Sequence, residues 1–147
     1  MRPRLALALL LVGFLPAPGS SEPAPGGTAP PHPRQATRMK REWGVEILGV
    51  RPTAAGYMLE LRYRVIDPEK AAALFDRRAK PELVDEESGA RFSVPSPPTT
   101  GEMRNSNPPL AGHTYWMLFA NPGGFVKPGR RVSVLIGDFR AAAIVAP

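Results

Sequence analysis

Apolar and polar positions alternate most regularly in YMLELRYRVI, residues 57–66. Every second residue up to Val65 is apolar, and the positions between are mostly charged: Tyr57, Leu59, Leu61, Tyr63 and Val65 against Met58, Glu60, Arg62 and Arg64. This period of two predicts a β-strand with one face in the core and one in water. The run GVEILGV before it places Val45 and Ile47 on one face, and the turn residues TAAG connect the two runs. We therefore predict a β-hairpin.

The alternation stops at DPEKAAALF, residues 67–75. Asp67 is a suitable N-cap, Pro68 fits the first helical position, and Glu69 suits the positive end of a helix. The run Ala71 to Phe75 then allows about two helical turns. This segment predicts a short connecting helix.

Residues 81–94, PELVDEESGARFSV, return to a hairpin pattern. Two short runs flank Glu87, Ser88 and Gly89, and Gly89 can adopt the positive φ that a tight turn requires. The polar, proline-rich stretch from Pro95 to Gly112 follows. A loop of this length in a compact domain is often a functional loop or a crossover between sheets.

The next strand, TYWMLFA at residues 114–120, is apolar on both faces. Tyr115, Met117 and Phe119 point one way, and Trp116, Leu118 and Ala120 point the other. Two hypotheses account for this pattern. Either the long loop or the short helix covers the second face, or that face is an exposed aromatic surface for a partner.

The turns NPGG and KPG precede RVSVLIG, and AAAIVAP provides a final short strand. About seven strands with regularly spaced turns predict an all-β fold, an antiparallel immunoglobulin-like β-sandwich with one short helix. A small closed barrel is the alternative. The segments AAGYMLELRYRV, TYWMLFANPGG and RRVSVLIGDFR resemble those of small exported bacterial immunoglobulin-like domains of undefined activity. The resemblance implies a fold and an export route rather than a reaction.

The N-terminus predicts export. Arg2 and Arg4 precede an apolar run from Leu5 to Leu15, and small residues and prolines follow, which is the layout of a signal peptide. The run is shorter than the ~20 residues that span a bilayer, although an uncleaved anchor is an alternative. We predict a signal peptide over residues 1–19, a Pro-rich disordered linker over 20–41 and a β-sandwich domain over 42–147. The protein is then periplasmic or secreted.

The charge and cysteine content exclude several classes of function. The net charge is +6, but from Glu42 onward thirteen Lys/Arg face twelve Asp/Glu, so the predicted domain is almost neutral. We therefore expect no nucleic-acid partner, and membrane contact only through the signal peptide or linker. The chain has no cysteine, which removes disulfides, thiolate metal sites and thiol catalysis.

Few residues suggest catalysis or metal binding. His32 lies in the predicted linker, so only His113 could act as a general base, and no hydrolase or phosphate-binding motif accompanies it. The adjacent acids Asp85, Glu86 and Glu87 lie at a hairpin tip and point in different directions. We predict no enzyme activity and no cofactor. A copper site using His113, Met117 and Met103 is the alternative, because these are imidazole and thioether ligands.

The sequence therefore predicts an exported, non-catalytic binding domain that recognises a protein or another macromolecule. The expected contact residues lie on the strand at 114–120 and on the long loop before it: Tyr115, Trp116, Leu118, Arg104 and Asn105. Trp and Tyr side chains dominate binding hot spots, which is why the strand is expected to provide the main contacts.

Overall fold

The computed structural model of the chain describes residues 31–147, so the predicted signal peptide and the first part of the linker lie outside it. The described residues contain seven strands, two α-helices and two short 3-10 turns. In chain order the helices and strands are α1 (Pro33–Trp43), β1 (Val45–Thr53), β2 (Met58–Val65), α2 (Pro68–Phe75), β3 (Glu82–Asp85), β4 (Arg91–Ser93), β5 (Thr114–Ala120), β6 (Arg131–Ile136) and β7 (Phe139–Val145).

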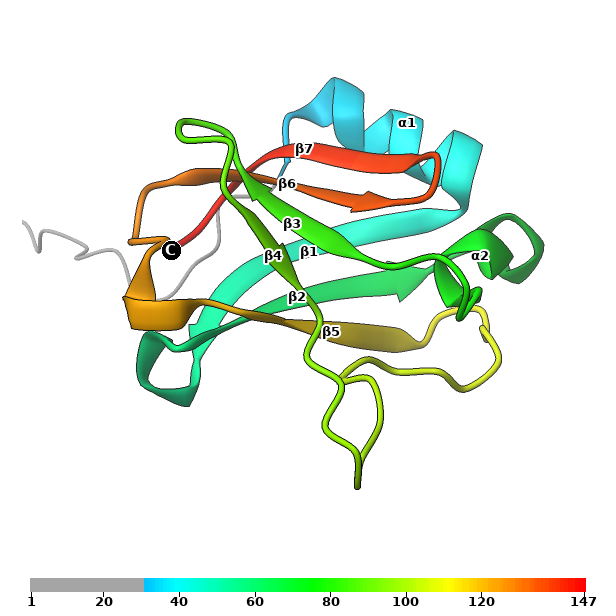
Figure 1. The fold of residues 1–147 in the computed structure, drawn as a ribbon. Coiled ribbons are helices and arrows are strands. Elements are labelled where there is room, and N and C mark those ends of the chain that lie inside the picture. Colours follow the sequence, from blue (N-terminus) through cyan, green and yellow to red (C-terminus); the bar gives the residue numbers. More distant parts are fainter. Residues whose placement is uncertain (1–30) are drawn as a thin grey trace, which may run out of the picture.

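The strands form two antiparallel sheets. One has the order β1-β2-β5 and the other the order β4-β3-β6-β7. In Figure 1, β3 and β4 cross in front of the first sheet, so that the two sheets form layers. The predicted predominance of β-strands and the number of strands are confirmed, with two α-helices instead of the one expected, and the two layers are consistent with a β-sandwich.

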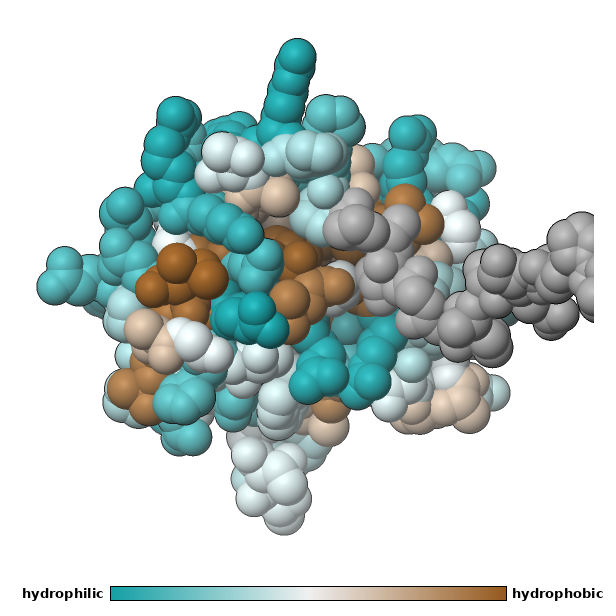
Figure 2. Space-filling model, turned by 180° about the vertical axis from the view of Figure 1, so that it is seen from behind, coloured by the Kyte–Doolittle hydropathy of each residue, from teal (hydrophilic) through white to brown (hydrophobic). Residues whose placement is uncertain are grey.

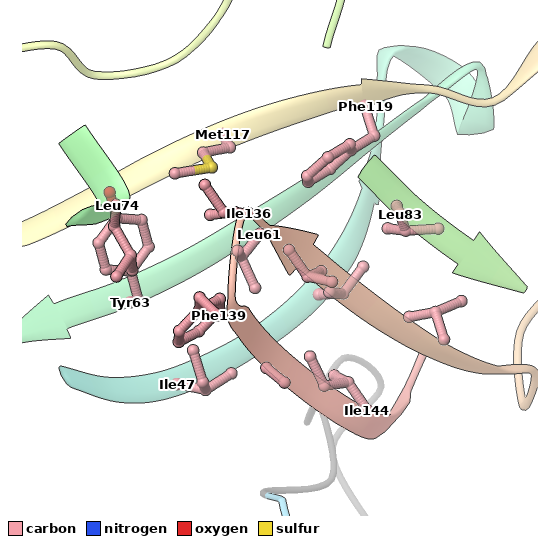
Figure 3. Close-up of a cluster of buried hydrophobic side chains, with 14 of the residues drawn as sticks. Ile47, Leu61, Tyr63, Leu74, Leu83, Met117, Phe119, Ile136, Phe139 and Ile144 are labelled. Atoms are coloured by element: carbon pink, nitrogen blue, oxygen red, sulfur yellow. The ribbon is translucent and has the colours of Figure 1, made fainter. Parts of the chain in front are cut away.

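The core lies between the two sheets, as the alternation in β2 predicts. Leu61 and Tyr63 of β2 and Met117 and Phe119 of β5 are fully buried. Figure 3 shows that they face residues from the second sheet: Leu83, Ile136, Phe139 and Ile144. Each fully buried apolar side chain of this size contributes about 1.5–3 kcal/mol relative to an exposed one.

Helix α2 begins and ends as predicted. The Asp67 side chain accepts hydrogen bonds from the backbone N–H groups of Glu69 and Lys70, and Pro68 occupies the first turn. Leu74 of this helix is buried. The helix therefore adds to the core at one end of the sheets (Figure 1).

Helix α1 differs from the expectation of a disordered linker up to Arg41. The side chain of His32 accepts a hydrogen bond from the N–H of Arg34, Pro33 occupies the first turn, and Gly44 ends the helix in the left-handed region. Met39 is buried, and the Trp43 ring packs edge-on against Phe139 with ring centroids 5.4 Å apart. These two residues, four positions apart, anchor a mostly polar helix beside β1 and β7.

The acids at the β3–β4 turn stabilise the fold. Buried Asp85 accepts hydrogen bonds from the Arg130 guanidinium and from the Ser88 hydroxyl and N–H. Glu86 accepts from the Ser133 hydroxyl and from the N–H of Ala143, whose φ of 52° is positive. Because each carboxylate is engaged within the fold, this cluster acts structurally.

Acid should weaken this cluster. Hydrogen bonds from Arg130 and Ser88 lower the pKa of Asp85 from 3.8 to about 2. A lowered pKa in the folded state means that the stabilisation is complete above about pH 4 and is lost as the pH falls toward 2. Asp85→Asn should therefore lower stability at pH 6 and flatten its decline between pH 4 and 2.5. Urea unfolding at several pH values measures the free energy of unfolding of both proteins. If the variant loses stability between pH 4 and 2.5 as steeply as the wild type does, the prediction is wrong.

Candidate functional site

The two faces of β5 have different environments. Tyr115, Met117 and Phe119 point into the core and are buried. On the opposite face Trp116 is 37% exposed, and Leu118 is half-buried. The strand therefore places one apolar face in the core and one at the molecular surface.

The register of β2 and β5 sets the neighbours of Trp116. Arg62 lies directly opposite Trp116, Glu60 opposite Leu118, and Met58 opposite Ala120. Exposed and half-buried side chains of both strands thus share one outer surface, which we call the β2–β5 face: Met58, Glu60, Arg62, Trp116 and Leu118.

The long loop extends this sheet on the far side of β5. The N–H of Asn105 donates to the carbonyl of Trp116 at 3.0 Å, and the N–H of Leu118 donates to the carbonyl of Met103 at 2.9 Å. The middle of β5 is therefore hydrogen-bonded on both sides, and a partner would meet the outer side chains here rather than add a strand at this edge.

Charged residues surround the apolar part of the β2–β5 face. The carboxylate of Glu60 lies between Arg51, at 2.7 Å, and Arg62, at 3.4 Å. Further along, Arg64 and Lys40 both pair with Glu46. Two arginines share Glu60, so the area next to Trp116 carries one excess positive charge.

Neither of the two proposed covers lies over Trp116. Helix α2 contacts the inner face of the sheet, where its Phe75 ring packs edge-on against Tyr115 with centroids 4.8 Å apart and lies near Tyr63. The segment Met103–Asn105 of the long loop lies beside β5 in the sheet. Within residues 31–147, neither segment covers Trp116, and the side chain remains partly exposed to solvent.

Figure 2 shows the molecule from behind, on the side away from β3 and β4. Brown apolar areas there are separated by teal side chains and do not merge into one continuous patch. Protein surfaces that bind partners reversibly have this mixed character, because such interfaces are about as apolar as the rest of the surface.

Two of the five predicted contact residues are buried. The Tyr115 hydroxyl donates to the carbonyl of Pro108 at 3.0 Å and accepts from the N–H of Leu110 at 2.9 Å, so this residue fixes the long loop to the core. Arg104 is also buried, and its guanidinium donates to the carbonyl of Asp76. Trp116, Leu118 and Asn105 are left as surface candidates.

The residues of the copper alternative lie in different environments. The Met117 side chain is fully buried in the core, whereas His113 is exposed just before β5 and Met103 is half-buried in the loop. Among residues 31–147, no group of three or more His, Cys, Asp or Glu side chains is placed to hold a metal ion.

No protein-family model, curated protein or solved structure matches this chain. Within the described part of the chain, no helix is long and apolar enough to cross a membrane. The candidate site therefore depends on the geometry alone.

Proposed function

We propose that this chain is an exported, non-catalytic binding domain of the immunoglobulin-like type that contacts a protein partner through the β2–β5 face. The observation that carries the proposal is the exposure of Trp116 in the middle of a strand. Exposing a large aromatic side chain to water at such a position costs more free energy than exposing a polar side chain would. A partner that covers it recovers this free energy.

The neighbours of Trp116 support a protein partner of mixed apolar and acidic character. Trp and Arg are enriched among residues that dominate binding energies, and here Trp116 and Arg62 are directly opposed. Arg62 is only partly neutralised, since Glu60 also pairs with Arg51. An acidic side chain on the partner would pair with Arg62 while an apolar one packs on Trp116 and Leu118.

A photo-crosslinking experiment tests the proposed surface. A benzophenone amino acid is placed at position 116, and in a matched control at position 57, where Tyr57 is 61% exposed but lies at a turn outside the β2–β5 face. Both variants are produced in the cells that make the protein. A specific adduct with one protein is expected from position 116 and not from position 57.

Binding to the purified partner then quantifies the contact. Trp116→Ala should weaken the affinity at least tenfold, as hot-spot residues do, while Tyr57→Ala leaves it unchanged. Trp116→Ala should stay folded and lose about 1–2 kcal/mol, because the side chain is 37% exposed on a strand, whereas Tyr57→Ala at a turn should stay within about 0.5 kcal/mol of the wild type. Equal affinities, or unfolding of Trp116→Ala, would refute the proposal.

A further inference from the structure

A basic pocket lies between the long loop and the connection from α2 to β3, segments that Figure 1 shows close together. Its volume is about 380 Å³, within the range of ~300–1,000 Å³ that is usual for small-molecule sites. Side chains from both segments line it: Arg77 and Lys80 on one side, and Thr100, Glu102, Arg104 and Ser106 on the other.

Positive charge is in excess in this pocket. Arg77, Lys80 and Arg104 face a single carboxylate, that of Glu102, which leaves a formal charge of +2 among the lining residues. Glu102 pairs with both Lys80 and the Nε of Arg104, the latter at 2.8 Å. Arg77 has no carboxylate partner among the described residues and donates instead to the Ser106 hydroxyl at 3.3 Å.

Arg104 makes this a built site rather than a group of surface lysines and arginines. Its side chain is 2% exposed, which is unusual for a cation. Nε forms an ion pair with Glu102 and Nη2 donates to the carbonyl of Asp76, but Nη1 is buried and has no hydrogen-bond partner among residues 31–147. A buried donor without an acceptor costs about 1–3 kcal/mol. The guanidinium is therefore held in place at the pocket wall, where it contributes a fixed positive charge.

We propose that this pocket binds a phosphate group. A phosphate dianion matches the excess charge of +2, and its several oxygens can accept from the exposed Arg77 guanidinium, the Lys80 ammonium and the hydroxyls of Thr100 and Ser106, while buried Arg104 contributes its charge. A carboxylate offers one charge and two oxygens and would leave donors unused. The site is independent of the proposed function, because it uses no residue of the β2–β5 face.

Glu102 sets the affinity of this pocket. Its carboxylate already engages Lys80 and Arg104, and hydrogen bonds from Lys80 keep its pKa below the ordinary value, so it is charged at neutral pH. An incoming phosphate must compete with it for the same cations. Glu102→Gln should therefore strengthen phosphate binding, which a purely structural ion pair would not do.

The test is a titration of the full chain with inorganic phosphate, followed by calorimetry and by backbone amide chemical shifts at constant ionic strength. We expect saturable binding, with shifts at Gly101 and Ser106. Arg77→Gln and Lys80→Gln should each weaken it by roughly tenfold, the loss of one charge-assisted hydrogen bond, and Glu102→Gln should strengthen it severalfold. Glycerol phosphate is titrated in parallel. Tighter binding of inorganic phosphate would identify the ligand as free phosphate, and tighter binding of glycerol phosphate would identify it as a phosphate ester.

The control is Arg78→Gln, which removes an adjacent arginine that pairs with Asp76 and does not line the pocket. The Arg78→Gln variant should bind phosphate with the same affinity as the wild type. The proposal is overturned if phosphate causes no saturable shifts, if acetate binds as tightly as phosphate, or if Arg78→Gln weakens binding as much as Arg77→Gln does.

Discussion

Replacing Asn121 with alanine should lower the free energy of unfolding by about 2–4 kcal/mol. Asn121 is 1% exposed and joins two turns. Its Nδ2 donates to the carbonyls of Gly56 and Val126 at 2.8 and 3.2 Å, and its Oδ1 accepts from the N–H of Val126 at 2.9 Å. Truncation leaves these buried backbone groups without partners, and such groups are costly.

Two further variants separate the loss of the Asn121 hydrogen bonds from the general effect of substituting an asparagine. Asn121→Asp has the same shape and keeps the acceptor for the Val126 N–H, but it places a carboxylate against two carbonyl oxygens. It should therefore be at least as destabilising as alanine at neutral pH. Exposed Asn107 provides a control, and Asn107→Ala should stay within about 0.5 kcal/mol of the wild type. Urea unfolding followed by circular dichroism measures all three, and a loss below 1 kcal/mol for Asn121→Ala would contradict the role assigned here.

Strand β2 was predictable because its sequence pattern has a period of two and only one of its faces is buried. In β2 the buried positions Leu59, Leu61, Tyr63 and Val65 coincide with the alternation in the sequence. The short helix was equally clear, since Asp67 and Pro68 form a standard helix start. In these segments local preference and tertiary packing agree.

Helix α1 was not predicted, because proline, polar and basic residues dominate around it. Its only strong local signals are Pro33 at the start and Gly44 at the end, eleven positions apart. Met39 and Trp43 bury one narrow side against β1 and β7. A helix of this kind is stabilised by its neighbours rather than by its own composition.

The candidate sites were predictable only in part. The double apolar face of β5 indicated that Trp116 was unusual, but the sequence did not show that α2 packs on the other face, beside Tyr115. The phosphate pocket joins Arg77 and Lys80 to residues 100–106, which lie in a different segment. Contacts between distant segments depend on sheet register and loop path, and neither can be read from periodicity.

One loop segment lies beside both sites. Through its backbone, Arg104 forms a bridge with Met117 of β5, while its side chain reaches the carbonyl of Asp76 and the carboxylate of Glu102, which lines the pocket. Its neighbour Asn105 donates to Trp116 on the same strand. The segment that completes the sheet beside the β2–β5 face therefore also holds the buried cation of the phosphate pocket.

Gly44→Ala should destabilise the fold by about 2–4 kcal/mol, because the residue joins the two helices through its backbone. Its N–H donates to the carbonyl of Met39, which ends α1, and its carbonyl accepts from the N–H groups of Ile66 and Asp67 before α2. Its φ is +62°, and a Cβ placed there would lie 2.5 Å from the carbonyl oxygen of Asp67. Backbone atoms cannot yield as a flexible side chain would, so the helices must separate.

Gly89→Ala isolates the part of this cost that comes from the backbone angle. Gly89 has a φ of +73°, but a Cβ added there meets nothing within 4 Å, so its substitution should cost only ~1–2 kcal/mol. The additional free energy of unfolding that Gly44→Ala loses, beyond the loss of Gly89→Ala, then measures the clash with Asp67. The near-ultraviolet circular dichroism signal of Trp43 should change in the Gly44→Ala variant as well. If both variants lose the same stability, Gly44 is required for its angle alone, and α1 is not held against the start of α2 at this point.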